Sequence, residues 1–284
     1  MLLPGMFILF LFSIVPMFGF VIAFQDYIPT LGITGSDWVG FDNFKYMFEL
    51  PDSFQVITNT LIIAVSKMVV NMVVPLCFAL LLNEVRQNFF KRTSQIIVYI
   101  PFFLSWVILS SILQNLLDMN GPINQIIMML GGDPVQFLTS NTWFVPILVV
   151  SDVWKGLGYS TILHMAAIIA IDPGLYEAAE IDGAKRIKQI LHITLPGILS
   201  NIVLQATLSL GNVLNAGFDQ IFNLYNPLVY RSGDIIDTFV YRIGLTQAQY
   251  GLATSVGMFK SVVSFLLIIL SYKLASKFAN YKIF

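Results

Sequence analysis

Long apolar stretches alternate with short polar ones along the chain. A helix needs about 20 apolar residues to cross the hydrocarbon core of a bilayer. Stretches of that length, with boundaries given to within a few residues, cover 2–24, 54–82, 94–117, 143–171, 199–224 and 256–276. The pattern predicts an all-α integral membrane protein whose six transmembrane helices form a single domain over residues 1–284. The first stretch lacks a basic flank and a small-residue cleavage site, which favours a retained helix over a signal peptide.

The composition fits a membrane protein and excludes other classes. Hydrophobic residues make up 57% of the chain and charged residues only 11%, against about 25% charged residues in soluble domains. No basic cluster in the sequence indicates nucleic-acid binding. Cys77 is the single cysteine and lies inside an apolar stretch, so it cannot form an internal disulfide.

The sequence also lacks the motifs of common catalytic and metal sites. There is no G-x-x-x-x-G-K-[ST] phosphate loop, and no H-E-x-x-H motif or Cys/His cluster that would bind a metal. We therefore expect a protein that is not an enzyme, hydrolyses no ATP itself and binds no metal or cofactor. His164, inside the fourth apolar stretch, is expected to hydrogen-bond between helices rather than to take part in catalysis.

Basic residues predict which side of the membrane faces the cytosol, because cytosolic loops carry an excess of Lys and Arg. Most of them fall in the loops after the second and fourth stretches or at the C-terminus: Arg86, Lys91, Arg92, Lys185, Arg186, Lys188, Lys273, Lys277 and Lys282. The opposite side carries Lys45, Arg231 and Arg242. The asymmetry predicts a multi-pass protein with both termini in the cytosol.

The polar segment 172–198 follows the fourth stretch and has a distinctive pattern. Asp172 and Pro173 are typical of a helix start, as N-cap and first helical residue. Gly183 permits the positive φ of a sharp turn, and an amphipathic stretch over 185–193 then leads to Leu195 and Pro196. We predict a short exposed helix, a turn and a second helix that re-enters the membrane.

Within this segment, Glu177-Ala178-Ala179 is followed after three residues by Gly183 and after nine more by Ile193-x-Leu195-Pro196. This spacing resembles the coupling loop of ABC importer permeases, through which such a subunit docks onto a separate ATPase. An ordinary amphipathic cytosolic loop is the alternative. The resemblance rests on Glu177, Ala178, Ala179, Gly183, Ile193, Leu195 and Pro196, and it implies that these residues couple the chain to an ATPase. The stretches 21–27, 79–84, 175–176, 217–221 and 236–242 are similar to carbohydrate permeases that take up oligosaccharides and polysaccharide fragments.

The resemblance carries expectations about fold and partners. It implies a type I ABC importer permease bundle with a cytosolic coupling helix, in the bacterial cytoplasmic membrane. It also implies a second homologous permease subunit, two ATPase subunits that use ATP and Mg, an extracellular solute-binding protein and an oligosaccharide substrate.

Polar side chains inside two apolar stretches are candidates for the translocation path. The fourth stretch carries Asp152, Lys155 and Tyr159 at helical spacing. The fifth carries Gln205, Ser209, Asn212 and Asp219 as one stripe, with Asn215 at its margin. We expect Asp152 and Lys155 to neutralise each other, and both stripes to face a sugar path. The alternative is hydrogen bonding between helices.

Two other functions remain open at this point. A permease for a non-sugar solute shares the same type of loop. A proton-coupled secondary transporter would use Asp152 or Asp219 as a proton relay and would show inverted repeats, which the sequence does not suggest. Lys67 and Lys260 also lie within apolar stretches, and the sequence indicates no partner for either.

Overall fold

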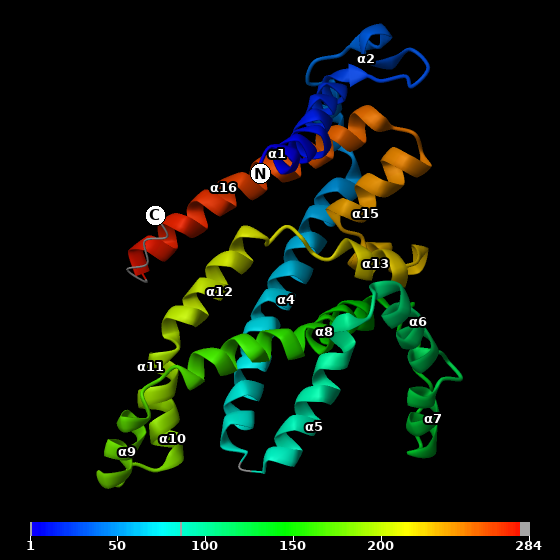
Figure 1. Ribbon diagram of the computed structural model, residues 1–284. Helices are drawn as coiled ribbons and strands as arrows, with labels where there is room; N and C mark the ends of the chain where they lie inside the picture. The colour runs from blue at the N-terminus through cyan, green and yellow to red at the C-terminus, as the bar shows by residue number, and fades with distance from the viewer. Residues whose placement is uncertain (1, 86, 279–284) are drawn as a thin grey trace. The chain divides into compact units, whose positions relative to one another are not determined.

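A computed structural model describes residues 2–85 and 87–278, with the backbone alone for Asn88 and residues 274–278. Within this part of the chain, the regular structure is helical except for one antiparallel pair of two-residue strands, β1 (Gln25–Asp26) and β2 (Asp37–Trp38) (Figure 1). The all-α prediction is therefore confirmed. Arg86 and Lys282, which contribute to the predicted orientation, lie outside the described residues, as does the side chain of Lys277.

Several helices are long and apolar enough to cross a bilayer. By length and composition, the described residues contain three such helices: Leu3–Phe24, Pro51–Glu84 and Tyr250–Lys273. Three bent pairs raise the number of spans to as many as six: Phe89–Phe103 with Trp106–Met129 (108°), Asn141–Ile169 with Pro173–Ile181 (67°), and Arg186–Gly197 with Leu199–Gly211 (57°). This agrees with the six predicted spans.

Contacts divide the chain into two compact units, and the predicted single-domain organisation stays a prediction. The first unit joins the chain up to Thr60 with Asp234–Phe265. Besides β1 and β2 it contains α1 (Leu3–Leu9), η1 (Phe10–Ile14), η2 (Val15–Phe24), α2 (Gly32–Gly35), α3 (Asp42–Glu49), the start of α4 (Pro51–Glu84), α15 (Ile236–Tyr241), η6 (Arg242–Thr246) and the first part of α16 (Tyr250–Phe278).

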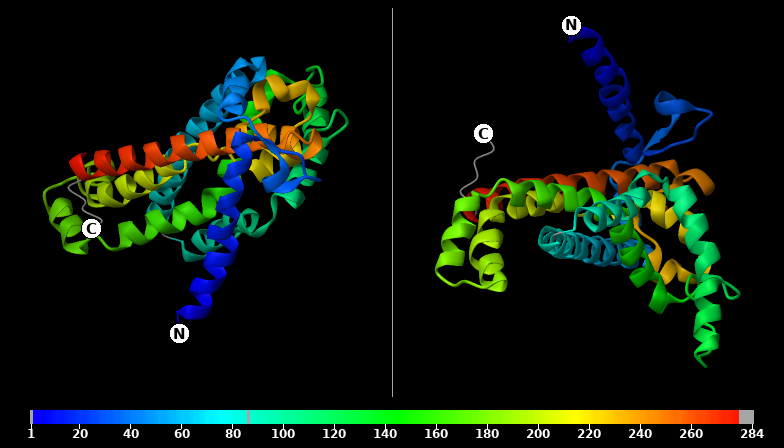
Figure 2. Two further views of the ribbon diagram at one scale, coloured as in Figure 1. Left: turned by 90° about the horizontal axis from the view of Figure 1, so that it is seen from above. Right: turned by 60° about the horizontal axis from the view of Figure 1, so that its bottom comes forward.

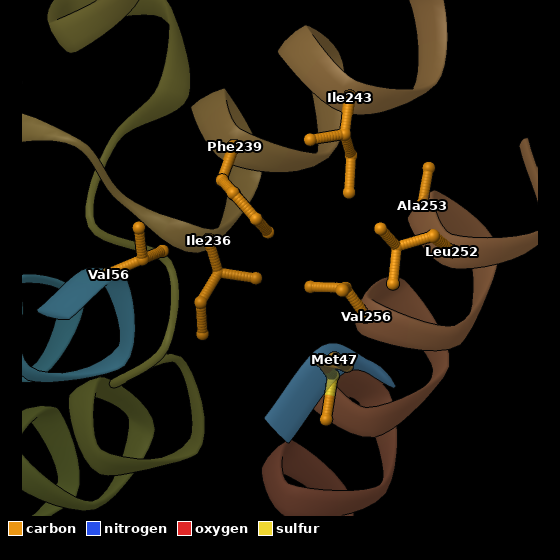
Figure 3. Packing of buried hydrophobic residues seen from close by; sticks show 8 residues of the cluster. All are labelled: Met47, Val56, Ile236, Phe239, Ile243, Leu252, Ala253 and Val256. Carbon is orange, nitrogen blue, oxygen red and sulfur yellow. The ribbon is translucent and has the colours of Figure 1, made fainter. Parts of the chain in front are cut away.

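The first unit has its own apolar core and two ion pairs. Figure 3 shows the core residues: Met47, Val56, Ile236, Phe239, Ile243, Leu252, Ala253 and Val256. Buried Asp234 accepts hydrogen bonds from Thr238 Oγ1 (2.7 Å) and Arg242 Nη2 (2.6 Å). Burial raises the pKa of the Asp234 carboxyl, and these two donors oppose the rise. Lys260 pairs with Asp237 at 2.6 Å, which supplies the partner that the sequence did not indicate.

The second unit joins Leu61–Gly233 with the chain from Leu266 onward. It contains the rest of α4 and α16 together with α5 (Asn88–Tyr99), η3 (Ile100–Phe103), α6 (Trp106–Leu117), α7 (Pro122–Met129), α8 (Asn141–Ile169), α9 (Pro173–Ile181), α10 (Arg186–Gln189), η4 (Ile190–Thr194), α11 (Leu195–Gly197), α12 (Leu199–Gly211), α13 (Phe218–Leu224), η5 (Pro227–Val229) and α14 (Tyr230–Gly233). The views in Figures 1 and 2 agree that α9 and α10 lie together at the end of α8, away from α6 and α13.

Two of the predicted continuous helices are broken, and both predictions were wrong in this respect. The stretch 94–117 bends by 108° between η3 and α6. Pro101 cannot donate a helical hydrogen bond, and Ser105 begins a new helix as its N-cap, with its hydroxyl accepting the backbone N–H of Ile108. The stretch 199–224 is interrupted between α12 and α13. There Asn212 Nδ2 donates to the backbone carbonyl of Leu208 (3.2 Å), which competes with the helix, and Gly217 adopts a φ of 95°.

A glycine lets α5 and α8 approach closely. A Cβ atom at Gly158 on α8 would lie 2.8 Å from the backbone oxygen of Val98 and 2.9 Å from the Cα of Tyr99. Small residues at such contacts are the usual means of close packing between membrane helices. The backbone atoms on the α5 side cannot move aside as a flexible side chain could.

We therefore predict that Gly158→Ala destabilises the protein by about 1–3 kcal/mol, the usual cost of overpacking. The measurement is the thermal unfolding midpoint of the purified protein in detergent. Gly257→Ala is the matched control, because a Cβ at Gly257 on α16 meets nothing within 4 Å and alanine favours a helix. Equal stability of the two variants would contradict the predicted contact.

Candidate functional site

The segment 172–198, called the coupling loop below, has the predicted local structure. Asp172 caps α9, with its carboxylate accepting the backbone N–H of Gly174 at 2.9 Å. Gly183 has a φ of 75°, and the backbone N–H of Ala184 closes the turn onto the carbonyl of Ala179 at 2.9 Å, as in helix C-terminal motifs. The helix start at Asp172 and the turn at Gly183 are both confirmed.

The coupling loop exposes large apolar side chains among its charged ones. Glu177 and Ala178 are exposed, and Ala179 is half-buried. Around them the loop exposes large apolar side chains, with Ile181 88% exposed and Ile187 72% exposed. Exposed apolar side chains gathered on one element are typical of a protein-binding surface.

The inner surface of the loop is held by hydrogen bonds. The Tyr176 hydroxyl lies 2.9 Å from the hydroxyl of buried Thr194, and Gln189 Nε2 donates to the carbonyl of Ala184 (3.2 Å). Arg186 approaches Glu84 at the end of α4 (3.7 Å), beside a cavity of about 220 Å³. The remaining predicted coupling residues lie at the re-entry point: Ile193 and Leu195 are half-buried, and Pro196 is exposed within α11. These contacts tie α9, α10 and η4 into one element.

The charge pairing inside the second unit differs from the prediction. Asp152 pairs with Lys67 of α4 at 3.5 Å rather than with Lys155, and it also accepts a hydrogen bond from Asn71 Nδ2 at 2.8 Å. The expected pair of Asp152 and Lys155 is therefore not a direct ion pair, although Asp152 still acts electrostatically on Lys155. The Asp152 carboxylate contacts two residues of α4, Lys67 and Asn71, and forms no ion pair with Lys155 on its own helix.

Lys155 instead closes the bend between η3 and α6. Its ammonium donates to the backbone carbonyls of Phe102 (3.1 Å) and Leu104, with Pro101 O at 3.4 Å. The Trp106 ring lies 5.6 Å away, within the range of a cation–π contact. These carbonyls lie at the end of the η3 turn, where a cation is favourable; Pro101 O also accepts the backbone N–H of Leu104 at 3.2 Å. Lys155 forms no ion pair among the described residues.

Tyr159 belongs to the same region and is half exposed. Its ring stacks on that of Phe102, with centroids 5.1 Å apart and planes at 7°. The Tyr159 side chain is 52% exposed, so one aromatic surface remains open beside the bend. Such a surface suits a sugar ring, and its place in the translocation path stays a prediction.

The second predicted stripe does not form one helical face. Gln205 and Ser209 lie on α12, Asn212 follows its last residue, Asn215 lies in the interruption, and Asp219 is in the first turn of α13. Asn212, Asn215 and Asp219 are nevertheless all exposed. The side-chain nitrogen of Gln205 is buried without a hydrogen-bond partner in the described structure. A path lined by these residues stays a prediction, but three of them would be presented by the interruption and the first turn of α13, not by a continuous stripe.

Sequence reasoning missed Gln220 and misjudged His164. Gln220 is fully buried and donates to the carbonyl of Leu148 and the hydroxyl of Ser151, both at 2.8 Å. An amide inside an apolar run was the available signal. His164 is also fully buried, yet neither ring nitrogen has a hydrogen-bond partner among the described residues, so the expected bond between helices is wrong. In the same part of the chain, no group of three or more His, Cys, Asp and Glu could hold a metal.

Comparison with known proteins places these features in context. Residues 71–280 match the model of a family described as binding-protein-dependent transport system inner membrane component. The polygalacturonan/rhamnogalacturonan transport system permease protein YteP of Bacillus subtilis (strain 168) is 45% identical over 281 residues, covering 99% of this chain and 88% of the relative.

Two solved structures are also similar. One is a crystal structure of a bacterial ABC transporter involved in the import of the acidic polysaccharide alginate, with a TM-score of 0.91, 35% identity, and coverage of 98% of this chain and 94% of that chain. The other is a bacterial alginate ABC transporter in complex with an alginate pentasaccharide-bound periplasmic protein, with a TM-score of 0.90, 35% identity, and coverage of 97% and 92%.

The contacts of Lys155 generate a prediction about stability. Lys155→Met leaves the carbonyls of Phe102 and Leu104 without their donor, which costs about 1–3 kcal/mol for groups left unsatisfied. We expect a lower thermal unfolding midpoint in detergent. Lys188→Met is the control, because Lys188 is an exposed lysine of the coupling loop. If both variants unfold with the wild-type midpoint, the bend does not depend on Lys155.

Proposed function

We propose a function from one premise: the chain belongs to the family of binding-protein-dependent transport system inner membrane components. The chain is thus a transport permease subunit of the type I fold and not an enzyme. We infer that it forms half of the translocation path of an ATP-driven importer of oligosaccharides. A gradient-driven secondary transporter is not favoured, because this family works with binding proteins.

The observation that carries the coupling role is the exposed apolar surface of the coupling loop. Ile181 and Ile187 face outward from the helix–turn–helix element, while Tyr176 and Thr194 hold its inner side. A rigid element with an apolar outer surface is suited to docking onto a partner protein. We propose that the partner is an ATPase, which uses ATP and Mg, and that two ATPase subunits serve this chain and a second homologous permease.

The substrate class follows from the relatives. YteP is a polygalacturonan/rhamnogalacturonan permease by name, and the solved transporter imports an acidic polysaccharide. We propose that this chain takes up oligosaccharide fragments of acidic polysaccharides, delivered by an extracellular binding protein. We further propose that the coupling loop and both termini lie in the cytosol, where the ATPase would bind.

The turn at Gly183 gives a direct test of the coupling role. A β-branched residue is strained at a φ of 75°, whereas asparagine tolerates this conformation. We predict that Gly183→Val lowers the affinity for the ATPase about tenfold, the factor that corresponds to about 1.4 kcal/mol. Gly183→Asn should retain most of the binding. The space around Gly183 is open, so a steric clash does not complicate the comparison.

The measurement is the amount of ATPase subunit that co-purifies with the tagged chain from native membranes in mild detergent. Sugar-stimulated ATP hydrolysis by the recovered complex is the second readout. A wild-type chain that brings down no second permease and no ATPase would argue against an importer. Equal recovery with the valine and asparagine variants would argue against a docking role for this turn.

The exposed polar and aromatic side chains near the two breaks generate a prediction about uptake. Asn212→Leu removes an amide that can bond to sugar hydroxyls, and Tyr159→Ala removes an exposed ring. Each should raise the KM for uptake of an oligogalacturonate by about tenfold, as expected for the loss of one contact worth about 1.4 kcal/mol. Uptake is measured with labelled sugar in cells that assemble the complex normally. Leu208→Ala on the exposed side of α12 is the control. Unchanged uptake in both test variants would remove these residues from the path.

A further inference from the structure

The most unusual side chain in the second unit is Lys67, near the middle of α4. It is only 6% exposed, although a charged side chain inside a membrane helix is costly. Its ammonium donates to the backbone carbonyl of Ala216 at 2.6 Å and to Oε1 of Gln220, and it lies 3.5 Å from Oδ1 of Asp152. An ammonium has three hydrogens, so these acceptors engage all of its donors.

One of these acceptors lies in the interruption between α12 and α13, and a second lies directly after it. Ala216 is in the interruption, and Gln220 follows it on the first turn of α13. Between them Gly217 has a φ of 95°, and a Cβ atom there would lie 2.9 Å from Lys67 Nζ. Glycine therefore permits both the backbone conformation and the close approach of the ammonium.

Other hydrogen bonds fix the same point from the side of α8. Gln220 Nε2 donates to Leu148 O and Ser151 Oγ, both at 2.8 Å. Asp152, also on α8, accepts from Asn71 of α4 at 2.8 Å. Lys67 thus joins α4, α8 and the start of α13 at one buried polar cluster. Among the described contacts of this cluster, none involves a side chain of α12.

We propose that Lys67 is a positioning residue, which holds the interruption at Asn212–Gly217 in place and so sets where Asn212, Asn215 and Asp219 are presented. A broken helix leaves backbone carbonyls without partners, and in an apolar environment another donor must satisfy them. Lys67 supplies that donor from a neighbouring unbroken helix. Its effect on transport rests on the proposed function, whereas its effect on the position of the interruption does not.

A different role for Lys67 would be simple neutralisation of Asp152. The two roles make opposite predictions for paired substitutions. Lys67→Met removes both the carbonyl contact and the charge, whereas Asp152→Asn removes the charge partner alone. If Lys67 positions the interruption, the double variant Lys67→Met with Asp152→Asn stays as disturbed as Lys67→Met. If Lys67 only neutralises Asp152, the double variant returns to wild-type behaviour, and the proposal is wrong.

The experiment places a thiol probe in the interruption. Cys77 is the single cysteine, so Cys77→Ser provides a cysteine-free chain into which Asn215→Cys introduces a reporter. The measurement is the rate at which a small methanethiosulfonate reagent labels the reporter in the purified transporter complex. We expect Lys67→Met to change the rate severalfold and Asp152→Asn to leave it unchanged. A reporter at Leu208 of exposed α12 should respond to neither substitution.

A second variant covers the case in which Lys67→Met does not fold. Gly217→Ala keeps the lysine, but its Cβ would lie 2.9 Å from the ammonium and a φ of 95° is strained for alanine, so it should also change labelling of the reporter. Wild-type labelling in both Lys67→Met and Gly217→Ala would overturn the proposal. Because labelling needs no sugar, it remains informative even if the complex transports no oligosaccharide. A complex that transports no oligosaccharide would contradict the proposed function. The labelling rates would still test the positioning role of Lys67 by themselves.

Discussion

A backbone that leaves the helical path inside a membrane must find other partners for its N–H and C=O groups, because hydrocarbon offers none. The second unit meets this constraint twice, each time with a lysine from an unbroken helix. Lys155 of α8 donates to the carbonyls at the η3–α6 bend, and Lys67 of α4 donates to Ala216 between α12 and α13. The cost of placing an ammonium among apolar helices is thereby offset by satisfying the exposed carbonyls. Each break supplies carbonyls that one of the two lysines engages.

This arrangement explains why the polar side chains are not all candidates for the same task. Lys67, Gln220 and Ser151 are buried and engaged with one another or with backbone, so they hold structure. Asn212, Asn215 and Asp219 are exposed, so they are the side chains available for the proposed contact with a solute. Asp152 stands between the two groups, half-buried and paired with Lys67. Burial, rather than residue type, separates the side chains that hold the structure from those that are available to a solute.

The helical class and the geometry of the coupling loop were predictable from sequence because they depend on local chemistry. Apolar length predicts spans, and Asp172 and Gly183 act on backbone groups within a few residues of themselves. The breaks were harder to predict, although Pro101 and Gly217 marked them. The pairing of Asp152 was not predictable, since its neighbour Lys155 looked like the natural partner. The true partner lies on a helix far away in sequence, and only tertiary packing brings it close.

The two helices that adjoin the coupling loop, α8 and α12, would transmit a movement of the loop to the translocation path in different ways. Both helices adjoin the coupling loop, but α8 runs unbroken from Asn141 to Ile169, past Asp152 and Lys155, whereas α12 ends at Gly211. A rigid helix carries a displacement along its length, while an interruption absorbs it in a few backbone torsions. Movement of the loop would therefore reach the Lys155 bend through α8 directly. Through α12 it would reach only the near side of the interruption, whose far side Lys67 and Gln220 hold to α4 and α8.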